Sequence, residues 1–226
     1  MLTRSLSCGG RRCRWSQQRV AHFASGGGSA KEEGSEEQAS APAPSYFAKW
    51  RGAGDPAAPA PPLSASLYAG ALSFASIGVL SLAHHGSELM GLTSCDFPVL
   101  LASFGATASL VFAAPDAPFS QPRNVIGGHV VSALVGTTAY QLCGTVLPEV
   151  ACPLAVAGAI IAMQQTRCLH PPSAATAMLA VIGSDAIHQL GFAFPGVAAM
   201  GSALLVGTGV IAHNMRSDRQ YPRYWW

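Results

Sequence analysis

Charged residues are scarce in this sequence. Only 11% of its 226 residues are Asp, Glu, Lys or Arg, against roughly 25% in soluble domains, whereas 50% are hydrophobic. Most of the charge lies before Pro56 or after His213, so the long central apolar runs carry almost none. This composition excludes an ordinary soluble domain and indicates a membrane protein in contact with a lipid bilayer. The formal net charge of +2 gives no reason to expect a nucleic-acid partner.

Sequence patterns of common enzymes and metal sites are also missing. The chain has no phosphate-binding loop and no nucleophile elbow. Its six cysteines show neither zinc-ligand nor disulfide spacing. His84 and His85 could share a metal ion only if further ligands, such as His188 with an Asp or Glu, converged on them. We therefore expect no enzyme activity, no cofactor and no resident metal, with a metal-binding membrane protein as a distant alternative.

Acidic residues are absent from the first 25 positions. Residues 1–25 instead contain several serines and five arginines, without the continuous apolar core of a secretory signal. This composition predicts an organelle transit peptide, mitochondrial or plastid, with an unprocessed basic tail as the alternative. The arginines are Arg4, Arg11, Arg12, Arg14 and Arg19.

Large apolar side chains are rare in residues 26–62, which are rich in Gly, Ser, Glu, Ala and Pro. Such a segment cannot bury a core, so we expect a disordered linker. Residues 46–52 interrupt it with Tyr46, Phe47 and Trp50 interleaved with two cations. This pattern is typical of an anchor at the membrane interface.

Six apolar runs follow and predict an all-α membrane domain over residues 63–214, with a basic and aromatic tail at 215–226. A spanning helix needs ~20 residues. The fifth run is short and Pro153 lies near the start of the fourth, which predicts half-length or broken helices whose freed backbone groups lie inside the protein. The runs are residues 64–83, 97–114, 125–147, 150–169, 172–183 with flanks, and 191–213.

The distribution of basic residues supports six spans with both ends on one side. All Lys and Arg of the loops and flanks then lie on that side, which satisfies the positive-inside rule and would face the matrix or stroma. The opposite loops contain no Lys or Arg. The residues on the basic side are Lys49, Arg51, Arg123, Arg167, Arg216, Arg219 and Arg223.

An internal repeat relates the two halves of the domain. Residues 105–110 match residues 174–179 at an offset of 69, and residues of the third run match the sixth at an offset of 71. Each unit holds three spans, so the second copy enters the membrane upside down. We therefore predict a 3+3 inverted repeat with short second and fifth helices, as in many transporters. The second set pairs Gly128, Ser132, Gly136 and Thr137 with Ala199, Ala203, Gly207 and Thr208.

The stretch from Arg167 to Thr176 indicates where a ligand would bind. Pro171 and Pro172 suit the first turn of a helix, whose positive end could attract an anion. Alternatively, the two prolines only sharpen a corner, with Arg167 and His170 at the lipid headgroups.

The inverted repeat would bring the starts of two small-residue helices together in the middle of the membrane. Their N–H groups and hydroxyls could replace the hydration shell of a small anion. In the alternative interpretation these small residues serve helix packing alone. The candidate residues are Ser103, Gly105 and Thr107 in the second span and Ser173 and Thr176 in the fifth.

Other polar residues lie near the third span. His129 is an ionisable group within it, which predicts either proton exchange or a structural hydrogen bond to a neighbouring helix. Arg123 and Asn124 precede it, and Arg123 and Arg167 occupy corresponding inner loops. The two arginines could concentrate anions, or they could act only as topology determinants.

Taken together, these motifs resemble the HPP family of integral membrane proteins from about Tyr46 to Trp226. The resemblance implies a multi-pass helical protein, and plant members of the family are associated with nitrite transport across the plastid envelope. The family usually has Ala-Gly after the prolines, where this chain has Ser173 and Ala174, so a glycine is lost and a hydroxyl gained. The motifs are Phe97-Pro98, Ser103 to Ala106, Phe112, Pro115, Gln121 to Asn124, Gly127 to His129, Arg167, His170 to Pro172, Ala175 to Ala177 and Tyr221 to Trp225.

The leading hypothesis is a passive or proton-linked transporter of a small inorganic anion, nitrite first, in a chloroplast inner envelope or mitochondrial inner membrane. Arg123 and Arg167 would attract the anion, His129 and His170 would bind it or exchange a proton, and the two helix starts would hold it. The rival hypothesis is a structural or assembly subunit in which the same motifs lock helices together. Whether copies of the chain associate is left open.

Overall fold

A computed structural model of the chain describes residues 45–50, 56–89 and 101–226. The predicted transit peptide, most of the predicted linker and residues 97–100 of the second apolar run lie outside the described residues. The chain divides into two compact units, residues 1–57 and 58–226. In the first, α1 (Tyr46–Lys49) begins after Ser45, whose hydroxyl accepts a hydrogen bond from the Ala48 N–H. Its exposed aromatic rings contact one another, and their role at a membrane interface stays a prediction.

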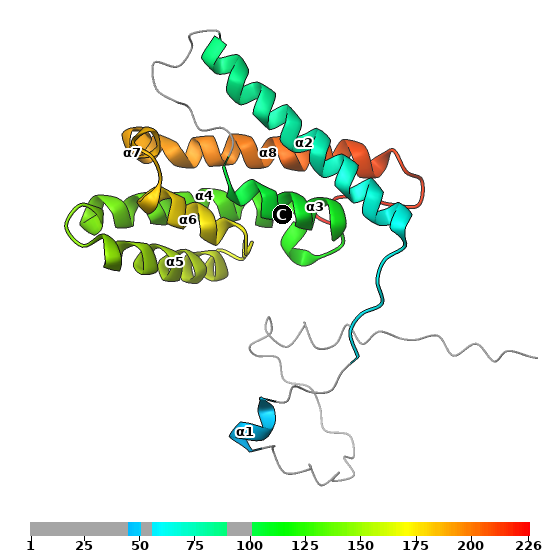
Figure 1. The fold of residues 1–226 in the computed structure, drawn as a ribbon, viewed down its shortest axis with the longest axis horizontal. Helices are drawn as coiled ribbons and strands as arrows, with labels where there is room; N and C mark the ends of the chain where they lie inside the picture. Colours follow the sequence, from blue (N-terminus) through cyan, green and yellow to red (C-terminus); the bar gives the residue numbers. More distant parts are fainter. Residues whose placement is uncertain (1–44, 51–55, 90–100) are drawn as a thin grey trace, which may run out of the picture. The chain divides into compact units, whose positions relative to one another are not determined.

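The second unit is helical, and its described residues form no strand (Figure 1). Each of the six apolar runs yields one helix, and the helices from the second and fifth runs are short, with 11 and 10 residues. The main helices are α2 (Leu63–Leu89), α3 (Ser103–Ala113), α4 (Pro122–Ala139), α5 (Pro148–Gln165), α6 (Ser173–Ile182) and α8 (Phe194–Asn214). The short elements are η3 (Pro118–Ser120), η4 (Tyr140–Gly144), α7 (Asp185–Leu190) and η5 (Gly191–Ala193).

Proline sets the start of three of these helices. Pro122, Pro148 and Pro195 occupy the first turns of α4, α5 and α8, where a missing N–H costs no hydrogen bond. By length and composition, two stretches of the described residues are long and apolar enough to cross a membrane, residues 63–86 and 185–214. The six-span count and the inverted topology therefore stay predictions.

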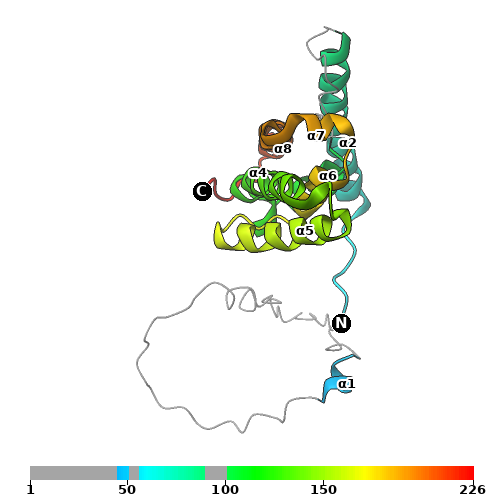
Figure 2. The same cartoon turned by 90° about the vertical axis from the view of Figure 1, so that its left-hand side faces the viewer.

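Helix α4 is the centre of the second unit. It packs against α8, α6 and α5, while α2 lies across α3 and α8 (Figures 1 and 2). Contact with α6 is closest at Gly136, because a Cβ at this position would overlap the backbone of Ala177. One apolar core joins residues of α2, α3, α4 and α8, and a second joins residues of α4, α5 and α6. Helix α4 therefore takes part in both cores and also carries buried polar side chains, His129 and Ser132 among them.

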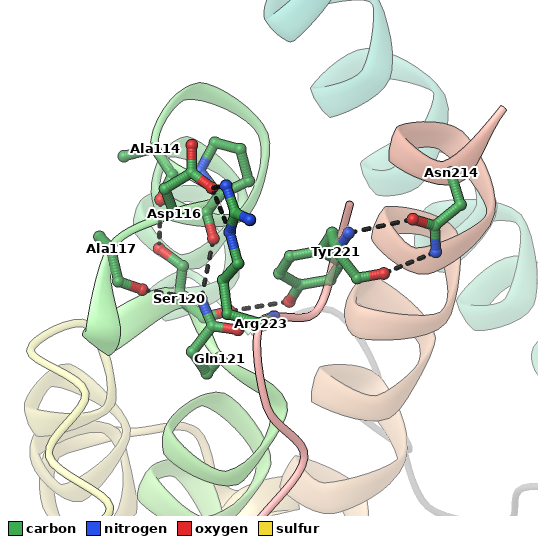
Figure 3. A network of polar contacts seen from close by, with 9 residues as sticks. Ala114, Asp116, Ala117, Ser120, Gln121, Asn214, Tyr221 and Arg223 are labelled. Carbon is green, nitrogen blue, oxygen red and sulfur yellow. Dashed lines mark hydrogen bonds and ion pairs between the residues drawn. The ribbon is translucent and has the colours of Figure 1, made fainter. Parts of the chain in front are cut away.

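Residues 215–226, here called the C-terminal strap, fold back from the end of α8 onto the turn between α3 and α4 (Figure 3). The Asn214 side chain bonds both the N–H and the C=O of Tyr221, at 3.0 and 2.6 Å. The buried Tyr221 hydroxyl donates to the carbonyl of Ser120 at 2.7 Å, and burial raises the pKa of this phenol above its ordinary value. Tyr221 therefore stays a hydrogen-bond donor at physiological pH.

We expect Tyr221→Phe to lower the free energy of unfolding by about 1–2 kcal/mol, because the buried Ser120 carbonyl loses this donor. The matched control is Tyr224→Phe. The Tyr224 hydroxyl is exposed and makes only long contacts of 3.3 and 3.4 Å, so its loss should change stability by under about 0.5 kcal/mol. Thermal unfolding in detergent, followed by circular dichroism, measures both effects. Equal stability of the two variants would contradict the structural role of the strap.

Candidate functional site

Five polar side chains meet where α3, α4 and α6 pack together. We call this group the central polar cluster. Each of its members is at most 3% exposed, although hydroxyls and imidazoles are costly to bury unless they are hydrogen-bonded. All were predicted as site residues from the sequence. They are Ser103 and Thr107 on α3, His129 on α4, His170 just before α6, and Thr176 on α6.

A continuous set of hydrogen bonds joins the cluster. The Thr107 Oγ1 lies 2.8 Å from Nε2 of His129 and 3.0 Å from Nε2 of His170, so one hydroxyl links both imidazoles. On its other side, His129 Nδ1 lies 2.8 Å from Thr176 Oγ1, which is 2.8 Å from Ser103 Oγ. The chain ends at His170 Nδ1, which lies 2.7 Å from the carbonyl oxygen of Phe119.

The two threonines on either side of His129 occupy corresponding positions of the predicted internal repeat. Thr107 and Thr176 are separated by the repeat offset of 69 residues, and each contacts a different ring nitrogen of the same histidine. The first turns of α3 and α6 therefore meet around one side chain of α4. This arrangement brings together the two helix starts that the sequence predicted to meet.

The carbonyl of Phe119 sets the direction of every hydrogen bond in the central polar cluster. A carbonyl oxygen only accepts hydrogen bonds, so Nδ1 of His170 carries a hydrogen. In a neutral ring, Nε2 of His170 then has no hydrogen and accepts a hydrogen bond from the Thr107 hydroxyl. The Thr107 hydroxyl has only one hydrogen, which points to His170, so Nε2 of His129 must donate to the Thr107 oxygen. Nδ1 of the neutral His129 ring then accepts a hydrogen bond from the Thr176 hydroxyl. The competing acceptor for the Thr107 hydrogen is the Ser103 carbonyl, at 3.2 Å. With both rings neutral, the hydrogens thus run in one sense from Ser103 to Phe119.

Close packing fixes the histidine rings. A Cβ added at Gly128 would lie 2.7 Å from the Cβ of His170 and 2.8 Å from the Oγ of Ser173, so only glycine lets α4 approach here. The Ser173 hydroxyl donates to the carbonyl of His170 at 2.6 Å, and the Phe104 ring meets His129 edge-on at 5.0 Å. Ser173, a predicted site residue, therefore positions His170 and does not join the chain of hydrogen bonds.

The helix-start N–H groups are already paired within their own turns. The N–H of Ser173 donates to the His170 carbonyl, and that of Ala174 donates to Pro171. The N–H of Gly105 likewise bonds Ala102 at 3.3 Å, and Gly105 lies on the exposed side of α3, away from the cluster. In this conformation the hydroxyls and imidazoles carry the polar chemistry of the site.

Arg123, Asn124 and Arg167 lie outside the cluster, around the loop that leads to His170. Arg123 donates to the carbonyl of Thr166 at 3.0 Å, and Asn124 donates to that of Leu169 at 2.9 Å. Arg167 is exposed and has a left-handed backbone, with φ of 56°. These residues can hold or surround the loop, but they do not touch either imidazole.

Sequence reasoning did not identify Phe119 or His213. Phe119 contributes only a backbone carbonyl, which leaves no signal in the sequence. His213 is buried at the end of α8 and bonds the Val111 carbonyl at 3.0 Å. The sequence did contain a signal for His213, because an ionisable residue at the end of an apolar run is a functional candidate by default.

Metal ligands do not gather in the part of the chain that the structure describes. No three His, Cys, Asp or Glu side chains there lie close enough to hold one ion. His84 and His85 stack on each other at 5.9 Å, and His188 stacks on Tyr140 at 3.9 Å.

Comparison with known proteins gives one family. The family model described as HPP, transmembrane region, matches residues 58–222. Two relatives from Dictyostelium discoideum, named only as transmembrane proteins, are 39% identical over 185 residues and 38% identical over 187 residues. The alignments cover 80% of this chain but 63% and 57% of the relatives, so the chain spans about six tenths of their length. No solved structure matches the chain.

Proposed function

The chain belongs to the HPP family of transmembrane proteins, and from this membership we propose that it carries a small inorganic anion together with a proton across an organelle membrane. Nitrite is the first substrate to test. The observation that carries the proposal is the Thr107 hydroxyl, which links His129 and His170 inside a membrane protein. Ionisable groups at such positions are costly and commonly mark ion and proton pathways.

The directed chain of hydrogen bonds supplies a route for the proton. A proton added to the Ser103 hydroxyl would be relayed from each group to the next through Thr176, His129 and Thr107. The relay would leave His170 protonated and positively charged. Each group then holds the hydrogen on its other side, and all bonds between Ser103 and His170 point the opposite way. No carboxylate or cation of the described residues hydrogen-bonds to the cluster, so the two imidazoles alone would take up the charge.

The positive charge on the protonated imidazole would attract the anion. A protonated imidazole turns an acceptor nitrogen into a donor, and the hydroxyls of Ser103, Thr107 and Thr176 can donate to an oxyanion once they part from one another. Arg123 and Arg167 would raise the local anion concentration beside the loop that carries His170. Because Ser103 at the start of α3 and Thr176 in α6 are joined by a hydrogen bond beside His129, a small separation there would open the cluster.

The completeness of the same network favours a second candidate function. Every buried side-chain nitrogen and oxygen of the central polar cluster already has a partner, as expected of a rigid structural or assembly subunit. Such a protein would hold its helices together through the cluster and move no solute. The two functions differ in whether purified protein transports anything.

The deciding experiment is nitrite uptake into proteoliposomes that contain the full chain, under an imposed pH gradient. Empty liposomes are the essential control, because nitrous acid crosses bare lipid. We expect uptake above this leak that rises with the gradient and alkalinises the outside medium. Uptake equal to the leak, from protein shown to be folded, would overturn nitrite transport and favour the structural role.

A further inference from the structure

The C-terminal strap and the turn between α3 and α4 together line a partly open cavity of about 50 Å³. Figure 3 shows contacts between the strap and this turn: the Arg223 N–H donates to the Gln121 side chain at 2.8 Å, and the Arg223 guanidinium pairs with Asp116 at 2.6 Å. The buried ring of His213 forms part of the wall. A cavity of this size exceeds the ~30 Å³ that one water occupies in the liquid, and it suits an ion of a few atoms.

His213, which lines this cavity, has an unpaired ring nitrogen. Its Nε2 lies 3.0 Å from the Val111 carbonyl oxygen, which only accepts hydrogen bonds, so Nε2 carries the hydrogen. Nδ1 of the neutral ring therefore has a lone pair and no hydrogen. Nδ1 of His213 is the one buried side-chain nitrogen or oxygen without a hydrogen-bond partner among the described residues. Leaving such an acceptor unpaired costs about 1–3 kcal/mol, so a proton or a donor at this point would be stabilising.

One cationic side chain at the cavity is not part of an ion pair with the carboxylates around it. Asp116 pairs with Arg223, and Asp218 pairs with Arg216 at 2.9 Å. Arg219 also lines the cavity, has no ion-pair partner among the described residues, and holds its guanidinium 5.8 Å from the Tyr68 ring centre. Because both carboxylates are already paired, Arg219 gives the cavity a net attraction for an anion.

We propose that this cavity binds a small monovalent oxyanion between Arg219 and His213, together with one proton on Nδ1 of His213. The proton converts the unpaired acceptor into a donor, so proton and anion stabilise each other in the cavity. The groups that face the His213 ring are the phenols of Tyr68 and Tyr221 and the charges of Asp116, Arg216, Asp218 and Arg219. The site is distinct from the central polar cluster and stands whether or not the protein transports nitrite.

The probe is sodium formate, an oxyanion of three heavy atoms that neither oxidises nor reduces the protein. Calorimetry on the purified full chain should show formate binding tighter at pH 5.5 than at pH 7.5, by about tenfold or more, since one proton can link up to tenfold per pH unit. In weakly buffered solution, formate should also take up protons from the medium, whereas gluconate, which is too large for the cavity, should not.

Two variants test the named residues. Arg219→Gln should weaken binding at both pH values, and His213→Gln should leave weak binding that no longer depends on pH. Lys49→Gln removes an exposed cation elsewhere and should bind as the unmodified chain does. Arg219 is partly exposed, so its variant should fold even if the His213 variant does not.

Formate binding that survives Arg219→Gln, or binding without proton uptake, would overturn the proposal and leave the cavity as a site for water only. Failure of nitrite uptake with formate binding intact would reject the transport function but not this site. Conversely, uptake that persists in Arg219→Gln while formate binding is lost would separate the strap site from the transport route.

Discussion

Replacing Thr107 with valine is expected to lower proton-driven nitrite uptake by about 10²-fold, the lower end of what positioned proton transfer contributes. Valine keeps the shape of threonine but removes the hydroxyl that joins His129 and His170. Both Nε2 atoms would then be buried without a partner. The free energy of unfolding should therefore also fall by ~2 kcal/mol or more.

Two further variants separate loss of the hydroxyl from general damage. Thr107→Ser keeps the hydroxyl and should retain most of the uptake, although it loses a methyl group from the core. Thr138→Val makes the same chemical change at an exposed position of α4, where the hydroxyl bonds only the carbonyl of Leu134 at 2.8 Å. It should behave as the unmodified chain. Uptake is measured per folded protein in proteoliposomes under a fixed pH gradient, and full uptake by Thr107→Val would reject the proton route through the cluster.

The sequence predicted the members of the central polar cluster because two regularities pointed to them. The offset of 69 residues paired Thr107 with Thr176, and the membrane setting made His129 and His170 conspicuous as ionisable groups. Repeat position and helix starts together indicated that α3 and α6 meet. Only the fifth apolar run was too short to span a bilayer, and a short second helix was predicted as part of the inverted repeat.

The sequence could not show which side of a helix each residue occupies. Gly105 lies in the same predicted helix start as Ser103 and Thr107, yet it faces outward. Arg123 was expected to attract an anion, which stays a prediction; its contact with the Thr166 carbonyl at the end of α5 had no signal in the sequence. Such placements depend on helix rotation, and runs of small residues give little periodic signal to fix that rotation.

Contacts across long sequence separations were equally hidden. The Phe119 carbonyl determines the direction of the hydrogen-bond chain, but a backbone group has no signature in the sequence. His213 and Tyr221 meet only because the strap folds back along α8, with ring centres 5.5 Å apart. The closing aromatic motif was visible as a family feature, and its role as a cover over His213 required the fold.

Replacing Gly136 with alanine is expected to lower the free energy of unfolding by about 2–3 kcal/mol, the upper part of the range for overpacked cores. The added Cβ would overlap the carbonyl oxygen of Ala177 and lie 2.8 Å from its Cα. These are backbone atoms of α6, so the whole helix must shift to make room. Since α6 carries Thr176, the shift would also separate Thr176 from His129 and reduce uptake.

Gly207 is the matched control, because the predicted repeat pairs it with Gly136 and it also lies within a long helix. No atom lies within 4 Å of a Cβ built there. Gly207→Ala should therefore be neutral or stabilise α8 by about 0.5–1 kcal/mol, since alanine loses less conformational entropy than glycine. Thermal unfolding in detergent compares the two variants. Similar losses in both would contradict the packing described here, because they would require α8 to be as closely covered at Gly207 as α4 is by α6. A clear difference would show that the two glycines paired by the predicted repeat serve different purposes, because Gly136 allows a close helix contact and Gly207 makes no such contact.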